Sequence, residues 1–142
     1  MIFICFGILA GFAFGFYLLD IKNTNQLVFV EGSSISLVTE KSDFKKGEEI
    51  KITIVNSGTI PITFLDSSYG LKISGLFGIL IYSPPASQIL TVLEPGKKIE
   101  FVWNQMKYDG TTVLEGLYKI HSIGTDSLGH KVEKTITVNI WK

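Results

Sequence analysis

The stretch Ile50-Lys51-Ile52-Thr53-Ile54 decides the fold, because its side chains alternate strictly between apolar and polar. In an extended strand, successive side chains point to opposite faces, so the three isoleucines would cover one face and Lys51 and Thr53 the other. A helix would instead bring together residues three and four positions apart. The stretch therefore predicts a half-buried β-strand.

Similar alternation recurs along the chain, for example at residues 60–64, 99–103 and 136–140, with turn signals such as Asn56-Ser57-Gly58 between the alternating segments. Short strands with a turn signal about every ten residues are typical of an immunoglobulin-like antiparallel β-sandwich. We therefore predict an all-β sandwich of seven to eight strands over residues 35–142, preceded by a tether and first strand region at residues 21–34.

An apolar leader precedes these strands. Ile2–Leu19 is a run of 18 uncharged residues, which as a helix would span roughly 27 Å and cross a bilayer core. We predict one uncleaved transmembrane helix, a signal anchor, over residues 1–20, in contact with membrane lipid. A cleaved signal peptide and a helix packed elsewhere are the alternatives. The expected location is the cell membrane, single-pass, with the C-terminal domain extracytoplasmic.

Three glycines recur every four residues in this leader, at Gly7, Gly11 and Gly15. On a helix they would form one smooth stripe, along which a second helix can approach closely. The stripe predicts pairing with another transmembrane helix, a membrane protein complex or a second copy of the chain. The alternative is that these glycines have no role in pairing, because glycine is frequent in transmembrane helices in general.

The net charge and the cysteine count exclude nucleic-acid binding and two kinds of cysteine-based structure. The chain has 13 basic and 13 acidic side chains, so its formal net charge is zero and no clustered basic surface is visible for nucleic acid. The single cysteine, Cys5, lies in the leader, which excludes a disulfide framework and a cysteine-based zinc site.

Candidate catalytic groups are few. His121 and His130 are expected to be solvated, one at the rim of a strand and the other in a turn, and Glu48-Glu49 is expected to be a solvated charge cluster. No nucleotide motif, metal set or nucleophile with a base in reach is found. We therefore predict a non-enzymatic protein without a cofactor.

The expected core residues also carry a resemblance to a known family. The core is predicted around Trp103, Tyr118, Phe101 and Ile120. Leu93-Glu94-Pro95-Gly96, Phe101–Gln105, Asp109-Gly110 and Gly116-Leu117-Tyr118 together resemble the closing motif of the bacterial intracellular proteinase inhibitor family (BsuPI type). The resemblance implies an immunoglobulin-like sandwich and, as an activity, proteinase inhibition. By the same resemblance, Tyr118 would form a tyrosine corner.

One run departs from alternation, because residues 76–82 are apolar at almost every position. Its outer face is covered either by another part of the chain or by a partner or the membrane surface. The candidate partner surface consists of Leu76, Phe77, Ile79, Ile81 and Tyr82.

These observations predict a membrane-anchored extracytoplasmic binding module, serving as an accessory or structural subunit of a membrane or cell-surface assembly. A proteinase inhibitor domain and a pilin-like filament subunit are the alternative functions.

Overall fold

The computed structural model describes residues 27–142. The predicted transmembrane helix over residues 1–20, with Gly7, Gly11 and Gly15, lies outside the described residues. Between Leu27 and Lys142, no helix is long and apolar enough to cross a membrane.

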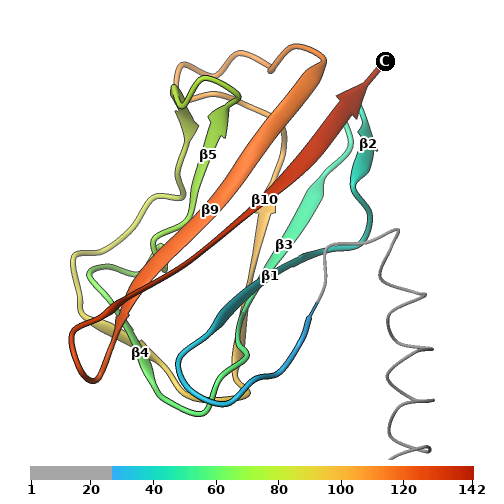
Figure 1. Cartoon of the computed structure of the whole chain (residues 1–142). Helices are drawn as coiled ribbons and strands as arrows, with labels where there is room; N and C mark the ends of the chain where they lie inside the picture. The colour runs from blue at the N-terminus through green and yellow to red at the C-terminus, as the bar shows by residue number, and fades with distance from the viewer. Residues whose placement is uncertain (1–26) are drawn as a thin grey trace, which may run out of the picture.

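The described part of the chain is an all-β sandwich of ten strands in two sheets (Figure 1). The strands are β1 (Ile35–Thr39), β2 (Asp43–Lys45), β3 (Ile50–Asn56), β4 (Ile62–Phe64), β5 (Lys72–Gly75), β6 (Leu80–Tyr82), β7 (Thr91–Leu93), β8 (Lys98–Trp103), β9 (Gly116–Asp126) and β10 (Lys131–Trp141).

The smaller sheet has the order β1-β3-β8, and the larger has the order β2-β10-β9-β4-β7. Two short strands share one edge of β9, since β4 pairs with it at Thr125 and Asp126, and β5 pairs with it from Tyr118 to His121. β6 continues the sheet beyond β5. All pairs are antiparallel except that of β2 with β10, which is parallel.

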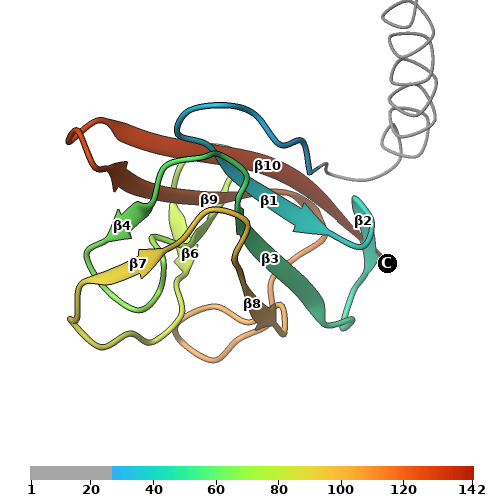
Figure 2. The same ribbon diagram turned by 90° about the horizontal axis from the view of Figure 1, so that it is seen from below.

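The core lies between the two sheets, which face each other in Figure 2. Ile50, Ile52 and Ile54 are fully buried from β3, the central strand of the smaller sheet. Trp103 packs edge-on against Tyr118 of the opposite sheet, with ring centroids 5.9 Å apart. Burying one isoleucine side chain stabilises the fold by about 1.5–3 kcal/mol. The three buried isoleucines of β3 therefore help to hold the two sheets together.

The strand count exceeds the expected seven to eight because several strands are only three residues long. β2 is one of them, and it overlaps Phe44-Lys45-Lys46-Gly47, a sequence that by itself predicts a turn. Phe44 is buried and lies in register with Ile140 of β10. Pairing with a strand almost 100 residues away makes this segment extended, and local sequence does not encode that contact.

Candidate functional site

The run of apolar residues 76–82 forms the tip of the β5–β6 hairpin. β5 and β6 pair antiparallel with a register shift after Ile73, and the N–H of Gly75 donates to the carbonyl oxygen of Ile79 at 3.1 Å. Gly78 has a φ of +83°, a left-handed conformation that glycine adopts without strain, and its N–H donates to Gly75. Around this glycine the turn carries Leu76, Phe77 and Ile79, whereas turns exposed to water usually carry polar residues.

The hairpin tip is exposed. Phe77 is 95% exposed and Ile79 is 72% exposed. Within residues 27–142, no other segment covers these two side chains. Ile81 and Tyr82 of the same run differ, because they are half-buried and pack against the core.

The connection between β8 and β9 completes this apolar surface. A hollow of about 690 Å³ lies between the hairpin and this connection and includes Leu76, Phe77, Tyr108 and Leu114 in its wall. We call the exposed apolar side chains around it the tip patch. Its members are Leu76, Phe77, Ile79, Leu80, Tyr108, Leu114 and Leu117.

One hydrogen bond and one ring contact join the hairpin half of the tip patch to the half from the β8–β9 connection. The N–H of Tyr108 donates to the carbonyl oxygen of Ile81 at 3.2 Å, and the Tyr82 and Tyr108 rings lie 6.1 Å apart. Asp109 accepts hydrogen bonds from the hydroxyl and the N–H of Thr111, and these bonds hold the pKa of its carboxyl below its ordinary value. The patch is thus a built surface rather than a loose loop.

Two of the four predicted core residues form hydrogen bonds to the β8–β9 connection, which carries part of the tip patch. Trp103 is 1% exposed, and its indole N–H donates to the carbonyl oxygen of Met106 at 2.9 Å. The Tyr118 hydroxyl donates to the carbonyl oxygen of Leu114 at 2.6 Å, and burial raises its pKa. Ile120 is fully buried, whereas Phe101 is only partly buried at the edge of the core.

Two buried amides have hydrogen-bonding roles that the sequence did not predict. Gln105 accepts from the N–H of Gly47 and donates to the carbonyl oxygens of Lys45 and Glu48, which closes the β2–β3 turn. Asn56 donates to the carbonyl oxygens of Ile60 and Leu93. A long-range contact creates each role, and neither residue stands out by type or spacing.

In the part of the chain that the structure describes, the histidines belong to no group of side chains that could hold a metal ion. The Nδ1 of His121 lies 2.6 Å from the hydroxyl of Thr135, and its Nε2 lies 3.6 Å from a Glu133 carboxylate oxygen. His130 is largely exposed beside the buried carboxylate of Asp126.

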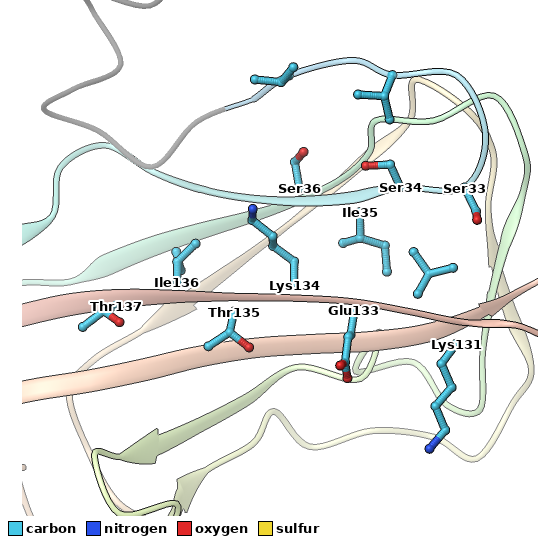
Figure 3. A pocket seen from close by; sticks show the side chains of 13 residues that line it. Ser33, Ser34, Ile35, Ser36, Lys131, Glu133, Lys134, Thr135, Ile136 and Thr137 are labelled. Carbon is cyan, nitrogen blue, oxygen red and sulfur yellow. The ribbon is translucent and has the colours of Figure 1, made fainter.

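A second hollow, of about 850 Å³, lies between residues 28–36 and β10. Figure 3 shows β1 on one side of it and β10 on the other, with Lys134 projecting from β10 toward Ser36. We call it the seam groove, since it follows the line where one edge of each sheet comes together.

No protein-family model and no curated protein matches the chain. Among solved structures, it is similar to Spo0M, a sporulation control protein from Bacillus subtilis, with a TM-score of 0.47 and 13% sequence identity. The match covers 80% of this chain and 51% of Spo0M, so the chain spans about half the length of that protein. At this level, the likeness carries no argument about function.

Proposed function

We propose that the chain is a membrane-anchored extracytoplasmic binding module without enzymatic activity, serving as an accessory subunit of a membrane or cell-surface assembly. The tip patch is its partner surface. The apolar leader of residues 2–19 supplies the anchor.

The observation that carries this proposal is the exposure of Phe77 and its neighbours on an ordered hairpin. Contiguous apolar surface of this kind is unfavourable in water and is common at sites of protein association. Aromatic side chains such as Phe77 and Tyr108 often provide much of the binding energy at such sites.

We further propose that the sandwich is immunoglobulin-like. Four observations support this topology. The smaller sheet has the order β1-β3-β8, and the chain crosses from this sheet to the larger one between β1 and β2. In the larger sheet, β2 pairs parallel with β10, and β9 and β10 form a long hairpin. The Tyr118 hydroxyl near the start of β9, bonded to the backbone four residues upstream, supports a tyrosine corner. In that fold, loops at the ends of the sandwich commonly make the contacts with partners.

Site-specific photocross-linking in the membranes where the full chain functions tests the partner surface. A benzoylphenylalanine probe replacing Phe77 should yield an adduct of defined mass. The matched control is the same probe at Leu128, which is also exposed but lies in the β9–β10 turn, at the other end of β9. Equal adducts from both positions, or none from position 77, would remove the tip patch from the proposal.

The anchor and the alternative activity are tested separately. Alkaline carbonate should leave the full chain in the membrane pellet, and external protease should digest the β domain of intact cells. Titration of serine and cysteine proteinases with the protein should leave their activity unchanged. Stoichiometric inhibition would instead favour the activity implied by the family resemblance.

A further inference from the structure

Part of the edge of β10 that faces away from β9 has backbone groups without a hydrogen-bond partner among residues 27–142. The N–H of Asp126 donates to the carbonyl oxygen of His130, so the even-numbered residues of β10 bond to β9. The N–H of Asn139 donates to Ser42 and the carbonyl oxygen of Trp141 accepts from Lys46, so the odd-numbered residues face the other side. The contacts on both sides of β10 therefore agree that the backbone groups of odd-numbered residues point away from β9.

The β2 strand covers only the last three residues of this edge, from Asn139 to Trp141. Farther toward the N-terminal end of β10, the edge borders the seam groove. Within the described residues, no hydrogen bond satisfies the backbone groups that face this groove. They belong to Lys131, Glu133, Thr135 and Thr137.

The groove also holds a lysine that has no ionic partner among residues 27–142. Lys134 lies on the same face of β10 as the buried Val132 and Ile136, and Figure 3 shows it projecting toward β1. Among residues 27–142, no carboxylate forms a salt bridge with it. A lysine on the inward face of an edge strand disfavours pairing with an apolar or basic strand, including a second β10.

We propose that the seam groove binds an extended segment of a partner protein, which adds to β10 as a further strand and places an acidic side chain opposite Lys134. Backbone hydrogen bonds to the free edge would hold the segment. Apolar residues two positions before and after the acid would lie over Val132 and Ile136, because alternate side chains of a strand share a face. This interface goes beyond the tip patch and is independent of it.

Amide hydrogen exchange on the full chain in mild detergent tests the proposal. The probe is a short peptide in which threonine and valine alternate and glutamate replaces the central valine. The control peptide has lysine at that position. The glutamate peptide should slow exchange at Glu133, Thr135 and Thr137 by about tenfold or more at saturation, and the lysine peptide should not. Equal binding of the two peptides, or no binding, would overturn the proposal.

Substitutions in β10 distinguish binding of the peptide through the Lys134 side chain from binding through backbone hydrogen bonds. Lys134→Glu should reverse the preference between the two peptides. Glu133→Pro removes one groove-facing N–H without removing a bond to β9, and should weaken binding on the order of tenfold. Glu133→Thr, which keeps the N–H, is its control, and equal binding by the two variants would contradict strand addition.

Other occupants of the groove would be visible in the same experiment. If the three amides are already protected in the full chain and become exposed when residues 1–22 are removed, the chain's own N-terminal segment fills the groove. If protection instead rises with protein concentration, a second copy fills it. Either result would overturn the assignment to a partner segment.

Discussion

Gln105 shows how one side chain can stabilise a turn that is remote in sequence. It is 1% exposed, and its amide makes three hydrogen bonds to the backbone of residues 45–48. Buried polar groups that lose such partners are costly, because water cannot replace them. The same logic applies to Tyr118, whose hydroxyl ties the β8–β9 connection to the core.

Gln105→Leu should lower the free energy of unfolding by about 3 kcal/mol, because the carbonyl oxygens of Lys45 and Glu48 lose their shared donor. Urea denaturation followed by tryptophan fluorescence measures the change. Asn104→Ala, at the exposed neighbouring position, should change it by less than about 0.5 kcal/mol. Similar losses for both variants would mean that the amide contacts contribute little.

Tyr118→Phe should cost about 1 kcal/mol, which is typical of one lost hydrogen bond. Trp103→Ala should cost about 3–5 kcal/mol, since it leaves a cavity against Tyr118 in the core. Urea denaturation followed by circular dichroism, which does not depend on Trp103 as a reporter, measures both. A loss below about 1 kcal/mol for Trp103→Ala would be inconsistent with its buried position.

At the scale of elements, the β9–β10 hairpin is closed by one carboxylate. Asp126 accepts hydrogen bonds from the backbone N–H groups of His130 and Leu128 and from the hydroxyl of Ser33. The bond from His130 is the largest cause that holds the pKa of Asp126 below its ordinary value, and those from Leu128 and Ser33 act in the same direction. The carboxylate thus joins the hairpin turn to the segment that leads into β1.

Asp126 should make stability depend on pH in the acidic range. Its pKa is lowered in the folded state, so the unfolded chain binds the proton more readily, and the stabilisation is present above the ordinary pKa of about 3.9. It is lost as the pH falls through the lower folded value. The melting temperature of Asp126→Ala should therefore fall less steeply than that of the wild type below about pH 4.

Thermal unfolding followed by circular dichroism at several pH values measures this difference. Glu94→Gln, at an exposed position, is the control and should follow the wild type. Parallel curves for Asp126→Ala and the wild type would show that the hairpin carboxylate does not couple folding to pH. Asp66, Asp109 and Glu48 also have lowered pKa values, so some acid sensitivity should remain in every variant.

At the scale of the whole molecule, the described residues contain a core of their own. Nineteen buried apolar side chains from Ile35 to Ile140 form one cluster between the sheets. The domain therefore has the material to fold without its apolar leader.

Removing residues 1–22 should give a soluble, monomeric domain with a β-rich circular dichroism spectrum, because both sheets and the core remain. Size-exclusion chromatography with light scattering measures the mass. A helical or unfolded spectrum would contradict the sandwich. Aggregation that Phe77→Ser relieves would identify the tip patch as the adhesive surface, whereas aggregation unchanged by Phe77→Ser would contradict a monomeric domain.

The sequence by itself determined the all-β class and the inward face of strands such as β3, because a period of two is encoded locally in Ile50, Ile52 and Ile54. It also located the apolar run at residues 76–82. Only the tertiary structure decided that Phe77 is exposed while Ile81 is half-buried, since exposure depends on which segments pack above a residue. The parallel pairing of β2 and the role of Gln105 likewise arise from contacts between distant segments, which no local pattern encodes. The same holds for the part of the β10 edge that no segment of residues 27–142 pairs with.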